Sequence, residues 1–268
     1  MSTPFRVCVI IPAAGRSTRF GEADKLIQDL GGRPLLMRTV ELFAKRDEVT
    51  SIIVAGPPDE FDLFRERYAA TIGFHGGKVV PGGKAERWET VKNALAAVPE
   101  DATHIAVHDA ARPGAPREML DRIFRAAATL PAVIPALPIN ATIKRLSVAQ
   151  TNVDDDENAI ADSILGEDRA AALTSRTVEA TIDRANLFEI QTPQIFRADL
   201  LRRAYAQPNL ASLKVTDDAS LIESIGQTVH AVEGDSRNFK ITTPADLRLM
   251  RAVLGVQPPS ERPAHMRF

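Results

Sequence analysis

The sequence holds a single cysteine, few aromatic residues and no long apolar segment. Its 268 residues include 11 Phe, 2 Tyr and 1 Trp, too few and too scattered for a surface that stacks nucleobases or sugar rings. Cys8 lies inside an apolar run, which favours a buried strand residue over a disulfide half or a metal ligand. No run approaches the ~18 apolar residues of a membrane span, and residues 1–6 lack a secretory signal pattern. We therefore expect a cytoplasmic protein with no membrane contact.

Neither sign of charge dominates the composition. Lys and Arg number 33, Asp and Glu number 35, and the formal net charge is −2. Proteins that hold a nucleic-acid backbone without sequence preference carry an excess of cations, so we expect no nucleic-acid partner. Any anion that this protein binds must be held by a local arrangement of donors and cations.

Short apolar runs alternate with segments of helical periodicity along most of the chain. This order is typical of β-α units and predicts an α/β fold, a mostly parallel doubly wound sheet with helices on both faces. The expected strands span residues 7–11, 51–55, 78–80, 104–107, 132–136, 228–232 and 238–241. The expected helices are one with Pro34 at its first position and those of residues 85–98, 117–130, 197–205, 217–225 and 244–254.

The alternation breaks between about Asn140 and Arg184, where several stretches are polar and acidic. We predict that residues 138–186 leave the sheet as a protruding arm of an otherwise single domain of residues 1–255. For the acidic part of this arm, a solvated loop is favoured over a new binding element. Residues 256–268 are expected to form a flexible tail.

A loop of small residues and cations follows the first predicted strand. It reads PAAGRSTRFG over residues 12–21, with Lys25 shortly after, at the end of a strand where open α/β sheets bind ligands. Because Ser17 and Phe20 stand at glycine positions, it matches neither the P-loop nor the dinucleotide fingerprint. Backbone N–H groups of small residues approach oxyanions closely, and Arg19 and Lys25 add positive charge for a triphosphate that loses pyrophosphate. A plain turn with solvated cations is the alternative.

A carboxylate ends the fourth predicted strand, in the segment HIAVHDAARP of residues 104–113. Asp109 is placed to hold Mg²⁺ beside phosphate oxygens, since this ion takes one or two carboxylates plus oxygens of its substrate. A helix-capping aspartate is the alternative. A histidine at a strand end is more often packed or solvated than basic in catalysis, so we assign His108 no role.

Three further segments carry polar residues at element boundaries. GGKAERWET, residues 82–90, opens a helix and is placed to contact a nucleobase, with Thr90 donating a hydroxyl. TDDAS at 216–220 and TPAD at 243–246 are each explained as helix N-termini. Lys240 lies in an apolar segment, where a cation costs stability unless it reaches a partner or an anion. We expect it to converge with Arg19 and Lys25 on one cavity beside Asp109.

Five ordered segments resemble the 2-C-methyl-D-erythritol 4-phosphate cytidylyltransferase family, and the resemblance covers residues 5–254. They are residues 12–25, 108–113, TPQIF at 192–196, TDDAS at 216–220, and the segment that runs from Glu233 and Gly234 through Lys240 to Pro244. The resemblance implies a Rossmann-like nucleotidyltransferase that uses Mg²⁺, transfers the cytidylyl group of CTP to that sugar-alcohol phosphate and releases pyrophosphate, in isoprenoid precursor synthesis by the MEP pathway. A ribitol 5-phosphate cytidylyltransferase shares most of the motifs and stays an alternative. A catalytically silent module that binds a sugar nucleotide is the alternative of another class.

The resemblance also implies roles for single residues. The implied catalytic cations are Arg19, Lys25, Arg184 and Lys240. The implied nucleotide-binding residues are Ala13, Ala14, Gly15, Gly83, Thr90, Asp109 and Ala110. The implied acceptor-binding residues are Asp109, Thr142, Arg184, Thr216 and Lys240, and Asp109 is the implied metal ligand. The arm of one subunit would reach its partner in a homodimer, so that Arg184 contacts the sugar phosphate.

The sequence departs from the family pattern at three places. Thr142 and Arg184 lie farther apart than in typical members, because the arm carries the acidic insertion. The loop at Gly82 is one residue longer than usual. Arg237 stands where some members have an aspartate, so a second metal carboxylate is either missing or supplied by Asp235.

Overall fold

The computed structural model describes residues 4–15, 20, 25–148, 150–152, 173–213 and 215–257. The chain falls into two compact units, Met1–Leu137 with Ile190–Phe268, and Pro138–Glu189. No helix within the described ranges is long and apolar enough to cross a membrane. Of the predicted tail, residues 258–268 lie outside the described residues.

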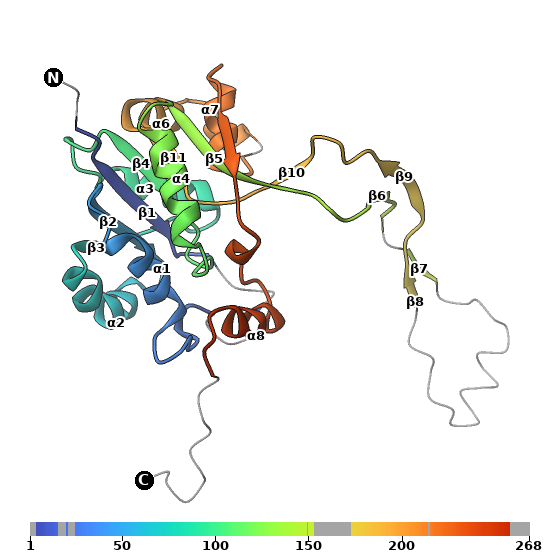
Figure 1. Cartoon of the computed structure of the whole chain (residues 1–268), viewed down its shortest axis with the longest axis horizontal. Coiled ribbons are helices and arrows are strands. Elements are labelled where there is room, and N and C mark those ends of the chain that lie inside the picture. Colours follow the sequence, from blue (N-terminus) through green and yellow to red (C-terminus); the bar gives the residue numbers. More distant parts are fainter. Residues whose placement is uncertain are drawn as a thin grey trace, which may run out of the picture. The chain divides into compact units, whose positions relative to one another are not determined.

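The central sheet has eight strands among the described residues, in the order β10-β5-β11-β4-β1-β2-β3, with β12 beside β5 (Figure 1). The strands are β1 (Val7–Pro12), β2 (Val49–Gly56), β3 (Gly77–Pro81), β4 (His104–Val107), β5 (Ala132–Pro138), β10 (Phe188–Ile190), β11 (Gln194–Arg197) and β12 (His230–Glu233). Strand β1 pairs in parallel with β2 and β4, β2 with β3, and β5 with β12, whereas β11 runs antiparallel to β4 and β5. The α/β fold and its mostly parallel sheet are confirmed.

Helices pack on both faces of this sheet. They are α1 (Leu35–Ala44), α2 (Phe61–Phe74), α3 (Arg87–Leu95), α4 (Arg117–Ala127), α6 (Ala198–Tyr205), α7 (Asp218–Ser224) and α8 (Pro244–Val253), with short 3-10 helices η2 (Lys25–Ile27), η3 (Leu210–Ser212) and η4 (Ser236–Asn238). Most of the buried apolar residues of α1, α2, α4 and α8 belong to one cluster, and those of α3, α6 and α7 belong to another. A sheet covered in this way is apolar on both faces.

Strand β1 shows why both faces need cover. Val7, Val9 and Ile11 belong to the first cluster, while Cys8 and Ile10 belong to the second, and all five are fully buried. Successive side chains of a strand point to opposite faces, so an unbroken apolar run fills two cores at once. The prediction that Cys8 is a buried strand residue is confirmed.

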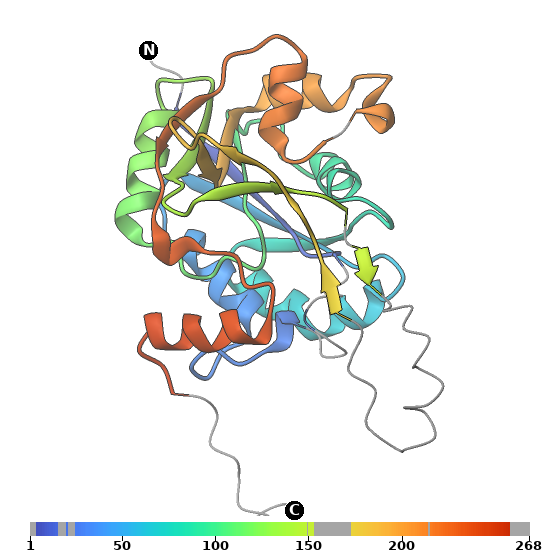
Figure 2. The ribbon, with the colours of Figure 1, turned by 90° about the vertical axis from the view of Figure 1, so that its right-hand side faces the viewer.

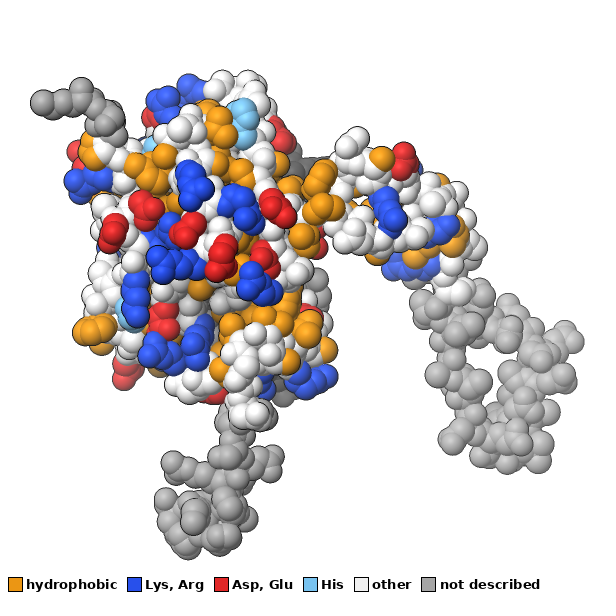
Figure 3. Space-filling view, viewed as in Figure 1, with side chains coloured by type: hydrophobic (Ala, Val, Ile, Leu, Met, Phe, Trp, Pro, Cys, Tyr) orange, Lys and Arg blue, Asp and Glu red, His pale blue; other side chains and the backbone are white. Residues whose placement is uncertain are grey.

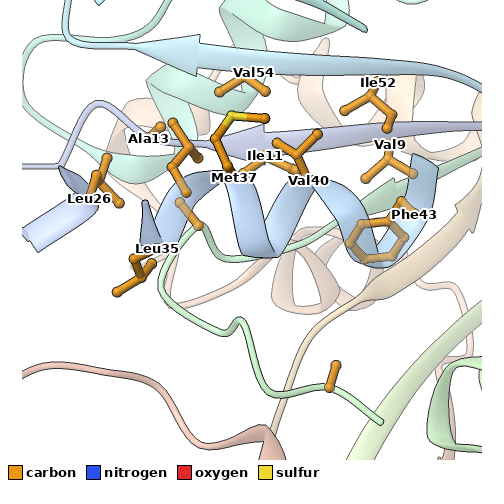
Figure 4. Close-up of a cluster of buried hydrophobic side chains, with 14 of the residues drawn as sticks. Val9, Ile11, Ala13, Leu26, Leu35, Met37, Val40, Phe43, Ile52 and Val54 are labelled. Atoms are coloured by element: carbon orange, nitrogen blue, oxygen red, sulfur yellow. The ribbon is translucent and has the colours of Figure 1, made fainter. Parts of the chain in front are cut away.

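Helix α1 covers β1 and β2 with one apolar stripe. Leu36, Val40 and Phe43 recur at helical spacing and are fully buried. Figure 4 shows Val40 and Phe43 against Val9 of β1, with Met37 toward the neighbouring strand. The proline before this helix is its N-cap rather than its first residue.

Helix α2 was not among the elements predicted from the sequence. Its buried residues, Phe64, Tyr68 and Ile72, recur every four residues and form a narrow stripe. Leu63 and Phe74 lie on the opposite side, 65% and 87% exposed. These exposed apolar residues blur the helical period, which explains why the pattern gave no signal.

The predicted strand of residues 238–241 is wrong. Residues 236–238 form η4, and the Ile241 N–H donates to the carbonyl of Ala111 at 2.9 Å. Arg112 Nη1 also donates to the Asn238 carbonyl at 2.7 Å. The backbone of this segment is therefore bonded to the loop after β4 and not to a neighbouring strand.

Strand β11 was likewise not predicted as a strand. It pairs Gln194 with Val107 of β4 and Ile195 with Val133 of β5, both in antiparallel register. With four residues, all but the last buried, it is too short to show an alternating pattern.

Within the described residues of the second unit, Pro138–Glu189, the strands form two antiparallel ladders. The predicted acidic loop falls largely on residues 153–172, which lie outside the described residues. Strand β6 (Ile143–Leu146) pairs with β9 (Val178–Ile182), and β7 (Gln150–Asn152) pairs with β8 (Leu173–Ser175). The Ser147 N–H donates to the Thr177 carbonyl at 2.9 Å beyond the first ladder. This unit thus carries its own hydrogen-bonded strands.

Candidate active site

A cleft of about 400 Å³ opens where β1 and β4 end. Ligands of open α/β sheets bind beyond the carboxyl ends of the strands, so the cleft lies where a substrate is expected. Its lining residues are Pro12, Ala13, Ala14, Gly15, Lys25, Leu26, Gly83, Lys84, Ala85, Glu86, Arg87, Thr90, Asp109, Ala110, Ala111, Lys240 and Thr242.

Most of the residues singled out in the sequence line this one cleft. They are Ala13, Ala14, Gly15, Lys25, Gly83, Thr90, Asp109, Ala110 and Lys240. Thr216 is exposed ahead of α7 and is not a lining residue. Thr142 and Arg184 belong to the second unit, where Arg184 Nη1 donates to the Asn140 carbonyl. Arg19 lies outside the described residues.

Asp109 is a buried carboxylate that lines the cleft. Its Oδ1 lies 3.2 Å from Arg87 Nε, and its Oδ2 lies 3.0 Å from Lys240 Nζ and 3.4 Å from Arg112 Nε. Burial by itself would raise the pKa of Asp109, but Arg87, Lys240 and Arg112 outweigh it and lower that pKa. The side chain is therefore a permanent anion surrounded by cations.

The turn that carries Asp109 is held by a buried histidine. His108 Nε2 lies 2.9 Å from the Arg112 carbonyl, which can only accept, so this nitrogen carries the proton. His108 Nδ1 then accepts from the Thr192 hydroxyl at 3.1 Å, and Thr192 Oγ1 accepts the Asp109 N–H at 3.0 Å. Burial lowers the pKa of His108 to about 4. Of the two alternatives left open by the sequence, packed or solvated, the structure shows His108 packed and fully buried.

The glycine loop before α3 is shaped by close backbone contacts. The Gly83 N–H donates to Thr90 Oγ1 at 3.0 Å, so this hydroxyl orders the loop in addition to lining the cleft. A Cβ on Gly83 would lie 2.3 Å from the Cβ of Glu89, which leaves room for glycine alone. The Glu89 carboxylate accepts the Ala85 N–H at 2.9 Å, and this bond and the Glu86 N–H lower the pKa of Glu89.

The loop that carries Lys25 is fastened to helix α8. Arg251 donates to the Asp29 carbonyl through Nε at 3.2 Å and Nη2 at 2.8 Å. Figures 1 and 2 both show α8 beside this early segment. The predicted cap of α8 is confirmed, with Thr243 as N-cap and Pro244 in the first turn. The segment after Lys25 is thus bonded to a helix more than 200 residues later in the sequence.

Two arginines of the site had been given no role from the sequence. Arg87 and Arg112 lie within the segments GGKAERWET and HIAVHDAARP, yet nothing in those segments indicates that both contact Asp109. Arg87 Nη1 also pairs with Asp218 Oδ2 at 2.8 Å, and Asp218 Oδ1 accepts from the Tyr205 hydroxyl at 2.6 Å. These residues are far apart in the sequence, so local sequence patterns could not predict their contacts.

The family model of IspD, 2-C-methyl-D-erythritol 4-phosphate cytidylyltransferase, matches residues 7–160 and 155–256. This chain belongs to that family. The family protein of Frankia casuarinae is 40% identical over 260 residues, covering 96% of this chain and 84% of that protein. The one of Syntrophotalea carbinolica is 36% identical over 250 residues, covering 92% and 96%. Both bear the family name.

Solved structures with the family name have the same fold. The crystal structure of 2-C-methyl-D-erythritol 4-phosphate cytidylyltransferase from Thermus thermophilus is similar with a TM-score of 0.68 and 30% identity, covering 94% of this chain and 100% of that chain. The Francisella tularensis family structure has a TM-score of 0.69 and 28% identity, covering 92% and 99%. The cleft described above therefore lies in a cytidylyltransferase fold.

The described residues around this cleft offer few carboxylates as metal ligands. Asp235 accepts from Arg237 Nε at 3.0 Å and Nη2 at 2.9 Å and does not line the cleft. Over the described ranges, no three His, Cys, Asp or Glu side chains gather at a point that would hold a metal ion. A divalent cation bound to Asp109 would also need phosphate oxygens of the bound substrate to complete its coordination. Mg²⁺ in nucleotide sites is typically coordinated in this way.

Proposed function

We propose that this family member transfers the cytidylyl group of CTP to 2-C-methyl-D-erythritol 4-phosphate and releases pyrophosphate, in isoprenoid precursor synthesis. One observation carries the proposal. Lys25 and Lys240, from opposite ends of the chain, line one cleft with Asp109 and the small-residue loop Ala13–Gly15. This is the arrangement that a triphosphate with a departing pyrophosphate requires.

The chemistry needs no protein nucleophile. A phosphate oxygen of the acceptor attacks the α-phosphorus of CTP, the new P–O bond forms, and the bond to the β-phosphate breaks. A phosphate monoester is already anionic at neutral pH, so the attack requires no strong base and depends on positioning and charge neutralisation. His108 fits this account, because both its ring nitrogens are engaged in holding the turn.

Cationic side chains neutralise the negative charge of the phosphates during the reaction. Lys25 and Lys240, which line the cleft, neutralise the α-phosphate and the leaving pyrophosphate. Arg19, which lies outside the described residues, is given the same role from the sequence resemblance alone. Backbone N–H groups of the loop at Ala13 to Gly15 approach the phosphate oxygens. The loop at Gly83 and Thr90 contacts the base and ribose of CTP.

Mg²⁺ is the cofactor that the site fits. Asp109 is ionised and faces the cleft beside the phosphate-binding loop, and one carboxylate plus phosphate oxygens is a sufficient ligand set for this ion. When bound, Mg²⁺ would neutralise and orient the phosphates of CTP. Asp109 alone of the described carboxylates is assigned to it.

The acceptor pocket in this proposal includes Thr142, Thr216 and Arg184, the last supplied by a second copy in a homodimer. The apolar surface of the second unit supports a dimer. Leu146 and Val178 are cross-strand partners on β6 and β9, yet they are 45% and 61% exposed. Paired apolar residues on a small two-stranded ladder favour burial against another chain.

The test of the function is a pyrophosphate-release assay with purified protein, CTP and Mg²⁺. One arm receives 2-C-methyl-D-erythritol 4-phosphate and the other receives ribitol 5-phosphate. Release in the first arm is the expected result. Release with ribitol 5-phosphate alone would establish the alternative acceptor, and release in neither arm would favour a silent binding module.

The dimer has a separate test. Sedimentation velocity at micromolar protein is expected to show a species of twice the chain mass. Arg184→Ala is expected to raise the KM for the acceptor and to leave the KM for CTP within about 3-fold. The reason is that the variant loses a contact with the acceptor alone, present in both its ground state and its transition state. A monomer with unchanged KM values would contradict the proposed acceptor pocket.

A further inference from the structure

The three cations around Asp109 are anchored differently. Lys240 contacts the carboxylate with one exposed ammonium, its side chain 40% exposed. Arg112 also donates to the Asn238 carbonyl. Arg87 joins two carboxylates, with Nε on Asp109 and Nη1 on Asp218.

Asp218 is an anion in the interior of the protein. Its side chain is fully buried, and its two oxygens are each used, one by Arg87 at 2.8 Å and the other by the Tyr205 hydroxyl at 2.6 Å. A buried carboxylate is strongly disfavoured unless a cation and hydrogen-bond donors accompany it. Arg87 is therefore held by two ion pairs, one with Asp218 and one with Asp109.

The position of Asp218 is itself fixed by the start of α7. The N-cap Asp217 accepts the Ser220 N–H at 3.0 Å. Gln194 at the start of β11 donates to Asp217 Oδ2 at 2.7 Å and accepts the Ala219 N–H at 3.0 Å. These bonds tie the first turn of α7 to the central sheet, so Asp218 is a rigid anchor for the guanidinium.

The anchor decides how Arg87 meets Asp109. An arginine prefers to bind a carboxylate with two parallel N–H donors, which covers both oxygens. Here the pairing of Nη1 with Asp218 fixes the orientation of the guanidinium, and in this orientation it meets Asp109 through Nε on Oδ1 alone. The second oxygen of Asp109, Oδ2, instead contacts Lys240 at 3.0 Å and Arg112 at 3.4 Å.

We propose that Asp218, seated by Tyr205, is a positioning residue that keeps Arg87 on one oxygen of Asp109 and thereby sets the affinity of the cleft for the divalent cation bound with CTP. The inference rests on the proposed function for the identity of that ligand. Without the Asp218 charge, Arg87 turns its fork onto both oxygens of Asp109 and competes with the cation.

The competing explanation is that Arg87 acts directly as a cation for the triphosphate. Asp218 would then merely weaken its charge. Removal of the Asp218 charge should in that case tighten the binding of CTP in the absence of metal and leave the metal affinity unchanged. The positioning role therefore predicts weaker metal binding in this variant, whereas the direct role predicts unchanged metal binding and tighter metal-free binding of CTP.

The experiment compares the wild-type protein with Asp218→Asn, Tyr205→Phe and Asp121→Asn. The first removes the anchoring charge with little change of shape, and the second removes the hydroxyl that seats it. Asp121→Asn is the matched control, because Asp121 on α4 pairs with Arg46 at 2.8 Å and does not line the cleft. Thermal unfolding of each variant establishes that it folds.

The main readout is equilibrium binding of Mn²⁺ in the presence of CTP and without acceptor, followed through the electron paramagnetic resonance signal of free Mn²⁺. Asp218→Asn is expected to weaken Mn²⁺ binding about 10- to 100-fold, the usual effect of losing a residue behind a metal ligand. Tyr205→Phe is expected to weaken it in the same direction by about 3-fold or more. Excess Mg²⁺ is expected to restore most of the transfer rate.

The outcomes separate the two proposals. Unchanged Mn²⁺ affinity in a folded Asp218→Asn protein, or tighter metal-free CTP binding with unchanged Mn²⁺ affinity, would overturn the positioning role. If Asp218→Asn does not fold, the Tyr205→Phe titration decides in the same way. A wild-type protein that binds Mn²⁺ and CTP but transfers nothing to the acceptor would refute the proposed function alone.

Discussion

The side chains of the cleft concentrate positive charge in a molecule with a net charge of −2. Lys25, Lys84, Arg87 and Lys240 are its basic lining residues within the described ranges, and Glu86 and Asp109 its acidic ones. On the face of the larger unit seen in Figure 3, acidic and basic side chains are interspersed. The attraction for a triphosphate is thus local to the cleft.

At the residue scale, Lys240→Met should remove a charge-neutralising group without unfolding the protein. Asp109 keeps its contacts with Arg87 and Arg112 in this variant. We expect kcat to fall by about 10²-fold, as for other oxyanion donors, measured by pyrophosphate release. Lys92→Ala, on the exposed side of α3, is the control, and an equal loss there would argue against a specific role.

His108 makes the stability of the protein depend on pH. Its folded pKa of about 4 lies below the value of ~6.5 of an unfolded histidine, so the unfolded chain binds more protons between these values. Stability is therefore present above pH ~6.5 and lost as the pH falls toward 4. We expect the free energy of unfolding to be about 2 kcal/mol lower at pH 5 than at pH 7 from this group.

The contribution of His108 can be isolated by urea denaturation at both pH values. Burial lowers the pKa of His104 as well, so the wild-type difference includes both residues. His108→Gln, which does not titrate, should shrink the difference, while His75→Gln at the end of α2 is the control. A difference unchanged in His108→Gln would contradict the assignment.

At the scale of elements, the N-terminus of α8 is both a cap and a wall of the cleft. The Asp246 carboxylate accepts three hydrogen bonds of 2.8 Å, from Thr242 N–H, Thr242 hydroxyl and Thr243 N–H. Thr242 in turn lines the cleft. Capping α8 therefore also places a cleft residue.

Loss of the Asp246 carboxylate should be more harmful than loss of the Thr243 cap. Thr243→Ala is expected to lower the free energy of unfolding by about 1 kcal/mol. Asp246→Ala removes three charge-assisted bonds and is expected to lower it by about 2 kcal/mol. Urea denaturation measures the free energy of unfolding of both variants. A larger loss in Thr243→Ala than in Asp246→Ala would show that the Asp246 carboxylate is not the main stabilising group at this helix terminus.

Two glycines give a matched pair of substitutions. Gly83→Ala cannot be accommodated unless the loop before α3 moves, because the new Cβ would lie 2.3 Å from Glu89 Cβ and 2.8 Å from the Thr90 nitrogen. We expect the KM for CTP to rise on the order of 10-fold or more. Gly73→Ala, within α2 and with no atom in reach, should instead stabilise the protein by about 0.5 kcal/mol. A KM for CTP in Gly83→Ala equal to that of the wild type would show that Gly83 does not contribute to CTP binding.

At the scale of the molecule, we expect the sheet, which is buried on both faces, to unfold as one cooperative unit. Cys8, the single cysteine, lies fully buried in β1 at the middle of this sheet. Burial raises the pKa of its thiol to about 11, so the reactive thiolate is scarce as well as inaccessible.

Cys8 should therefore report global unfolding. We expect no reaction with a disulfide reagent at pH 8 in the native protein and one thiol per chain in urea. The urea midpoint of labelling should coincide with that of circular dichroism. Fast labelling of the native protein would show that the sheet opens locally at β1.

Local pattern was enough for most of the fold and part of the site. An apolar run such as Val7–Ile11 is dictated by burial on two faces, and small residues with cations after it indicate a phosphate loop wherever the strand lies. Helix caps such as Thr243 depend on neighbours within four residues. For this reason β1, α8, Lys25 and Asp109 were predictable one by one.

Only the tertiary structure decided which of these residues meet. The backbone of residues 238–241 bonds to the loop after β4 instead of forming a strand, and β11 enters the sheet antiparallel. Asp218 pairs with Arg87, although 131 residues separate them. Such contacts depend on how the elements pack over the whole chain, whereas spacing and capping depend on a few adjacent residues.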